Sequence, residues 1–118
     1  MPDSPGGGVN PTAEQGVGVN EPIALGWIDH DVSVAIGWDR AQMRRLARRL
    51  GYQLVWPDER SMLPVADQAR DAGADAVILP TPDHLGPLEL NRVMNVADVE
   101  TVIPRLSFAR WSIRQTSR

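Results

Sequence analysis

Four short apolar segments, separated by segments with helical features, constrain the fold of this chain more than any other feature of its sequence. They occupy residues 23–28, 52–56, 74–80 and 99–104. Each is bounded by proline, glycine or a charged residue, as expected for a buried strand rather than a helix. Strands that alternate with helices are typical of a parallel sheet whose connections are right-handed crossovers.

Three helices are predicted between these strands. For the first, over residues 40–51, Asp39 is the predicted N-cap and Gly51 the residue that stops the last turn. Its apolar face consists of Met43, Leu46, Ala47 and Leu50. The second helix is predicted from about Pro64 to a stop at Gly73, and the third begins at Pro87.

The predicted fold is a small three-layer α/β domain of flavodoxin-like type, with a four-stranded, mainly parallel sheet over residues 23–104. Residues 1–22 are rich in Gly, Pro, Asn and acidic residues and carry few apolar side chains. Such a segment cannot bury enough apolar area to offset its ordering entropy, so it is predicted to be a disordered tail. Residues 105–118 are predicted to form a basic C-terminal tail.

The composition narrows the classes of function. A length of 118 residues suits one domain, and no apolar run approaches the ~20 residues that span a bilayer, so a soluble cytoplasmic protein is expected. The absence of cysteine excludes disulfides and thiolate sites, and the absence of lysine excludes Schiff-base and P-loop lysines. The net charge of −3 is unlike that of a generally basic nucleic-acid binder. No cofactor is predicted.

Polar residues follow three of the predicted strands. Because ligands bind beyond the carboxyl ends of the strands in open parallel sheets, loops 29–33, 57–59 and 81–84 are expected to share one rim. The candidate rim residues are Asp29, Asp31, Ser33, Asp83 and His84. Their carboxylates fit the Mg²⁺ site of a small metal-dependent enzyme, and Ser33 with the histidines fits a hydrolase, although no G-x-S-x-G elbow is present. Such residues are more often solvated loop residues or helix caps, so no catalytic residue or metal ligand is assigned.

Arginines cluster in the first predicted helix, at i, i+4 spacing, and again in the C-terminal segment. The candidate binding residues are Arg40, Arg44, Arg45, Arg48, Arg49, Arg105, Arg110 and Arg114. Such clusters bind phosphates or an acidic protein partner, or they form the solvated face opposite the apolar one. Phe108 and Trp111 lie among the C-terminal arginines and fit either a docking surface or packing on the sheet.

The segments "ALGWIDHDVS", "LARRLGYQLV" and "ARDAGADAVILPTPDHLGP" follow one another over about residues 23–103. In this order they resemble the catalytic domain of serine recombinases, the resolvase and invertase family. That family has a first strand reading roughly Y-x-R-V-S and a third strand that leads into a D-R-L-x-R loop, to which "PDHLGP" is similar. The resemblance implies the same three-layer α/β plan.

Residue by residue, the resemblance implies that the chemistry is missing. With Trp27 in the place of the family's tyrosine, the catalytic arginine falls on Asp29 and the nucleophilic serine on Asp31. In the loop, the two family arginines fall on His84 and Pro87, and only the aspartate is matched, by Asp83. An aspartate or a proline cannot neutralise a scissile phosphate as arginine does. The expected function is therefore a catalytically inactive binding or regulatory module, whose partner is DNA or an acidic protein. The alternatives are the metal-dependent enzyme and a protein-docking module that uses Phe108 and Trp111.

Overall fold

The structure, a computed structural model, describes residues 21–111. Residues 1–20, where most of the disordered tail is predicted, and the candidate Arg114 lie outside the described residues. The elements in chain order are β2 (Ile23–Gly26), α1 (Ile36–Leu50), β3 (Gln53–Val55), α2 (Val65–Asp71), β4 (Ala76–Leu79), the 3₁₀ helix η3 (Pro82–His84), α3 (Pro87–Met94), β5 (Asp98–Thr101) and β6 (Leu106–Phe108).

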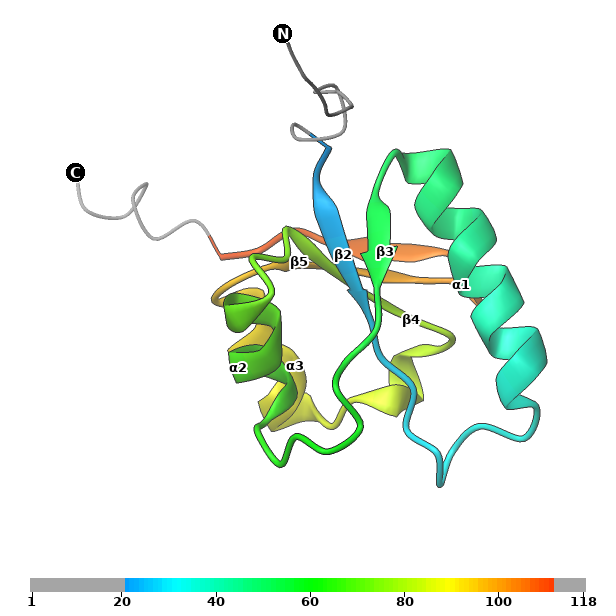
Figure 1. Ribbon diagram of the computed structural model, residues 1–118, viewed down its shortest axis with the longest axis horizontal. Helices are drawn as coiled ribbons and strands as arrows, with labels where there is room; N and C mark the ends of the chain where they lie inside the picture. The colour runs from blue at the N-terminus through cyan, green and yellow to red at the C-terminus, as the bar shows by residue number, and fades with distance from the viewer. Residues whose placement is uncertain (1–20, 112–118) are drawn as a thin grey trace, which may run out of the picture.

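One sheet with the strand order β3-β2-β4-β5-β6 forms the middle layer. β3, β2, β4 and β5 are parallel, and β6 pairs antiparallel with β5 at the edge. Helix α1 covers one face of the sheet, and α2 and α3 lie side by side on the other (Figure 1). The three-layer α/β architecture predicted from the sequence is therefore confirmed. The chain leaves β2 first towards β3 on one side and later reaches β4 on the other, so the sheet has a topological switch point between β2 and β4.

Two apolar clusters hold the layers together, and the strands divide their side chains between them. Because side chains alternate along a strand, Ala76 and Ile78 of β4 face α1, whereas Val77 and Leu79 face α2 and α3. The cluster under α1 contains Met43, Leu46, Ala47, Ala24, Ala76 and Ile78. The cluster on the opposite face includes Leu25, Val65, Ala69, Val77, Leu79, Val93 and Val99. Burial on both faces explains why the central strands are apolar along their whole length.

The sheet has five strands, so the prediction of a four-stranded sheet was one strand short. The additional strand, β6, comes from the segment predicted as a basic tail, and its register places Phe108 beside Val99 of β5. Phe108 is partly buried against the core. A strand of three residues at the edge of a sheet carries no periodic pattern long enough to be recognised in a sequence.

Helix α1 begins at Ile36, four residues before the predicted start, and its N-cap is Ala35 rather than Asp39. Asp39 lies in the first turn, where its backbone N–H donates to the Ala35 carbonyl at 2.9 Å. Its carboxylate accepts a hydrogen bond from the Ser33 hydroxyl instead of capping the helix. The predicted end is confirmed: Gly51 at the C-cap has φ +83°, a conformation in which a side chain is disfavoured.

Candidate functional site

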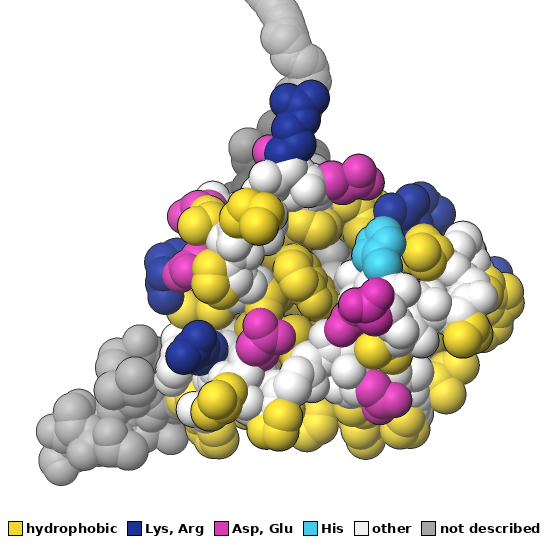
Figure 2. Space-filling view, turned by 90° about the horizontal axis from the view of Figure 1, so that it is seen from below, with side chains coloured by type: hydrophobic (Ala, Val, Ile, Leu, Met, Phe, Trp, Pro, Cys, Tyr) yellow, Lys and Arg dark blue, Asp and Glu magenta, His cyan; other side chains and the backbone are white. Residues whose placement is uncertain are grey.

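A pocket of about 490 Å³ opens at the carboxyl ends of the first parallel strands, beside the switch point. It is lined by residues 27–30 after β2, by residues 57–59 and Ser61 after β3, by Gln68 of α2, by His84 of η3 and by Glu89 of α3. Figure 2 looks at this end of the molecule and shows apolar side chains on the floor of the hollow with acidic side chains around it. We call it the rim pocket. Of the five candidate rim residues, it brings together Asp29 and His84, whereas Asp31, Ser33 and Asp83 are outside its lining.

His84 is the buried polar residue of the rim pocket, with an exposed fraction of only 4%. Its Nδ1 accepts a hydrogen bond of 2.8 Å from the backbone N–H of Asp29. Burial lowers the pKa of the imidazole below its ordinary value, and the neighbouring carboxylates, led by Asp39, oppose this effect only in part. The ring is therefore held neutral, with its proton on Nε2.

The loop after β2 is a turn organised by Asp29. The Asp29 carbonyl accepts from the backbone N–H groups of Val32 and Ser33, and its carboxylate accepts from the N–H of Asp31 at 2.9 Å. The Ser33 hydroxyl donates to Asp39 at 2.6 Å, so it is paired with a carboxylate and not with a histidine. The Ser33 hydroxyl therefore does not make the serine–histidine contact that activates the nucleophile of a Ser–His hydrolase.

The rim carboxylates are spread over several segments of the chain. Within residues 21–111, no three His, Asp or Glu side chains lie close enough together to hold a metal ion. Asp29 shares the rim pocket with Asp58 and Glu59, but Asp31 and Asp83, which the metal-dependent alternative needs, do not line it.

A second hollow, of about 210 Å³, lies between α1 and the connection from β5 to β6. Its lining consists of Gln42, Arg45, Leu46, Arg49, Val102, Ile103 and Arg105. We call it the arginine groove. Arg45 and Arg49 are one helical turn apart on the exposed side of α1, and Arg105 comes from a segment more than fifty positions later in the chain. Arginines of the first helix and of the C-terminal segment, the two clusters of the sequence, thus meet at one place.

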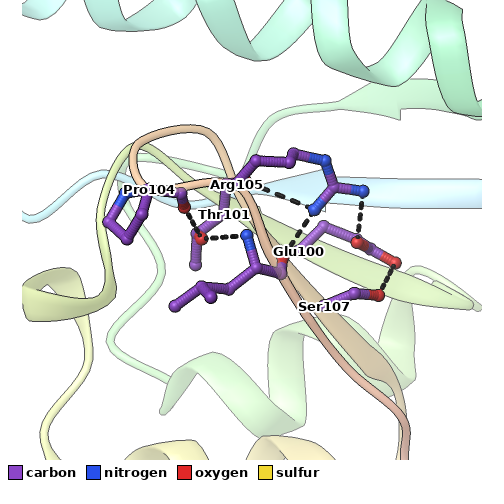
Figure 3. Close-up of polar contacts among 6 residues, drawn as sticks. Glu100, Thr101, Pro104, Arg105 and Ser107 are labelled. Carbon is purple, nitrogen blue, oxygen red and sulfur yellow. Dashed lines mark hydrogen bonds and ion pairs between the residues drawn. The ribbon is translucent and has the colours of Figure 1, made fainter.

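The groove arginines differ in how they are held. Arg105 donates from Nη1 to the Leu106 carbonyl at 2.6 Å, and its Nη2 lies 2.8 Å from Oε1 of Glu100 (Figure 3). Glu100 is 7% exposed, and its other oxygen accepts from the Ser107 hydroxyl. Arg105 is therefore fixed in orientation. No ion pair among residues 21–111 involves Arg45 or Arg49, so their charges face solvent.

Arg40 and Arg44 stack on Trp56, the residue that follows β3. The guanidinium carbons lie 5.5 and 5.8 Å from the centre of the indole ring, within the range of cation–π contacts. The indole itself lies over Gly26, where an added Cβ would come within 2.5 Å of a ring carbon. Glycine at the end of β2 thus allows the ring to lie against the sheet, and the ring in turn orders two arginines.

The remaining candidates are separated from both sites. Arg48 lies on the exposed side of α1 but does not line the arginine groove. Arg110 is held near the amino end of β5: its Nε lies 3.6 Å from Asp98, and its guanidinium donates to two backbone carbonyls. Trp111 is half-exposed, and its indole N–H donates to Asn91 of α3 at 3.1 Å.

Some lining residues have no local signal in the sequence. Gln68 and Glu89 reach the rim pocket from the first turns of α2 and α3, and Gln42 reaches the arginine groove from α1. Polar positions on helices are common, so only the packing of the helices on the sheet selects these three. Trp56 had a recognisable signal, because it is a large aromatic residue directly after a predicted strand and before a proline.

Comparisons of the chain with protein-family models, with curated proteins and with solved structures give no significant match. Within residues 21–111, no helix is long and apolar enough to cross a membrane.

Proposed function

We propose that this chain is a non-catalytic, resolvase-like binding domain that contacts the phosphate backbone of nucleic acid through the arginine groove. The observation that carries the proposal is the convergence of Arg45, Arg49 and Arg105 on one hollow whose lining contains no carboxylate. The strand order supports a flavodoxin-like plan, since the parallel strands counted from Ile23 follow the order second, first, third, fourth.

The absence of catalysis is inferred from the rim. Asp29 and Asp31 stand where the resemblance to serine recombinases would require an arginine and a serine, and both belong to a turn of backbone hydrogen bonds. Ser33, the nearest hydroxyl, donates to Asp39. A carboxylate beside a phosphodiester raises the energy of the transition state instead of lowering it.

Phosphate is the group that the groove suits best. Guanidinium groups bind phosphate oxygens in pairs of parallel hydrogen bonds, and the Gln42 amide adds a further donor. Glu100 holds Arg105 in place before any partner arrives, which reduces the entropy lost on binding. Arg40 and Arg44, ordered by Trp56 at the β3 edge of the sheet, lie on the other flank of α1 and form a second basic patch outside the groove. Repeated phosphates along a nucleic-acid backbone match the three neighbouring arginines of the groove better than a single anion does.

Fluorescence anisotropy with a labelled DNA duplex and a labelled single strand, at low and at moderate salt, tests the proposal. Binding is expected at low salt and should weaken with salt, with a slope of about −0.9 per phosphate contacted for the duplex. The double variant Arg45→Gln/Arg49→Gln should weaken binding to either nucleic acid and reduce the salt slope for the duplex by about two.

The matched control is Arg70→Gln. Arg70 lies on α2, on the opposite side of the sheet, and is paired with Asp67 at 3.0 Å. This variant should bind like the wild-type chain. The proposal fails if neither nucleic acid binds at low salt, or if Arg70→Gln weakens binding as much as the double variant does. Tight binding of polyglutamate combined with no binding of nucleic acid would instead identify an acidic protein as the partner.

A further inference from the structure

The rim pocket is separate from the arginine groove. We infer that it is a second binding site and that its ligand is a small organic cation. This ligand has an aromatic or apolar body and carries a hydrogen-bond acceptor. Its volume of about 490 Å³ lies within the range of roughly 300–1,000 Å³ that is usual for small-molecule pockets. Its position at the carboxyl ends of the strands, next to the switch point, is where open α/β sheets bind ligands.

The floor of the pocket accounts for the apolar body of the ligand. Trp27, Ile28 and Pro57 contribute apolar surface, and each follows directly or almost directly after a strand, so the sheet fixes its position. Trp27 is also partly buried against the core. An indole held in this way offers a flat surface to a ring and attracts a cation placed over its face.

The charges of the lining side chains indicate that the ligand is positively charged. Four carboxylates line the pocket, from three separate segments: Asp29, Asp58, Glu59 and Glu89. Arginine does not occur in the lining. Arg40 lines an adjoining hollow of about 60 Å³, which shares Ile28, Pro57 and Glu59 with the rim pocket, and its guanidinium stacks on Trp56. Carboxylates around a concave site with an apolar floor concentrate cations and exclude anions.

His84 supplies an observation that does not depend on the acidic residues. It is 96% buried, yet it lines the pocket, and its Nδ1 is already occupied by the N–H of Asp29. The neutral ring therefore carries its proton on Nε2, and no group among residues 21–111 accepts a hydrogen bond from that atom. Nε2 is not one of the fully buried atoms that lack a partner among residues 21–111, so its N–H is open to the pocket. A ligand that presents an acceptor to this N–H gains a directional hydrogen bond on binding.

Titration of the nitrogen-labelled full chain with pairs of small molecules tests the inference. Tyramine is compared with tyrosol, tryptamine with tryptophol, and benzylamine with benzoate. These pairs keep the ring and change the charge. Each amine should produce saturable shifts of the Trp27 indole N–H and of the Asp29 and Glu59 amides. Tyramine, the amine whose hydroxyl oxygen can accept from His84, should bind about tenfold more tightly than tyrosol.

Two variants separate the pocket from general acidity. Asp58→Asn/Glu59→Gln removes two lining charges and should weaken amine binding severalfold, because both side chains line the pocket. Asp31→Asn removes an exposed charge of the same rim that is outside the lining, and it should bind amines like the wild-type chain.

Three results would overturn the inference: no amine shifts these signals, each amine binds no more tightly than its partner, or the two variants weaken binding equally. Because the arginine groove contains none of these residues, the two binding sites can fail independently.

Discussion

Protonation of His84 should destabilise the folded state, and the structure gives the direction and limit of the effect. Burial lowers the pKa of this imidazole, and Asp39, Asp29 and Asp83 only partly counter that shift. At pH values between the lowered pKa of the folded state and the ordinary pKa of the unfolded chain, the unfolded state binds up to one proton more than the folded state. Stability from this residue is therefore complete above the unfolded pKa and is lost as the pH falls through the window towards the folded pKa.

The size of the pH effect is limited because the folded and unfolded states differ by at most one bound proton at His84. The free energy of unfolding should fall by at most about 1.4 kcal/mol per pH unit within this window. Protonation also turns Nδ1 into a donor, which breaks the 2.8 Å hydrogen bond from the Asp29 N–H. Loss of this bond acts in the same direction as burial, because both favour the neutral ring.

Urea denaturation of the wild-type chain and of His84→Asn, from about pH 8 to about pH 5, measures the effect. The variant has no imidazole at this position, so the difference in stability between the two proteins should shrink as the pH falls. Val34→Ser is the control, because it changes an exposed side chain that does not titrate and should leave the wild-type pH dependence unchanged. Parallel curves for wild type and His84→Asn would refute the reasoning, since they would mean that His84 titrates equally in the folded and unfolded states.

Three further substitutions test the packing, each measured by urea denaturation. Gly51→Ala should cost about 1 kcal/mol, since alanine disfavours the φ of +83°; no loss would mean that α1 ends differently. Gly26→Ala should cost about 1–3 kcal/mol and change the tryptophan fluorescence, because the new Cβ displaces the ring of Trp56; an unchanged spectrum would contradict this contact. Ile78→Ala should cost about 2–5 kcal/mol, as the side chain is fully buried under α1, whereas Val34→Ser, at a position 99% exposed, should change stability by less than about 0.5 kcal/mol.

Local features of the sequence were enough to predict most of the secondary structure. The apolar face of α1 through Met43, Leu46 and Ala47 is buried as its spacing requires, although Leu50 is 36% exposed. The stop at Gly51 and the start of α3 at Pro87 are where the sequence predicts them. These features depend on a few neighbouring residues, because periodicity, caps and proline act within one or two helical turns.

The arrangement of the sites was not determined locally. His84 follows prolines in a polar stretch and has the sequence of an exposed loop residue, but η3 places it under the turn of Asp29, fifty-five positions earlier. Strand β6 exists because β5 offers an unpaired edge, and its short sequence alone does not specify it. In each case the partner is distant in the sequence.

The sequence by itself determined which residues form the parallel strands, which face of α1 is apolar, and which loops carry charge. Only the tertiary structure decided that Arg45 and Arg49 meet Arg105, while Asp29 meets His84. The physical reason is that strand order and register set which distant segments become neighbours. Those choices follow from the free energy of packing the whole chain and not from any one segment.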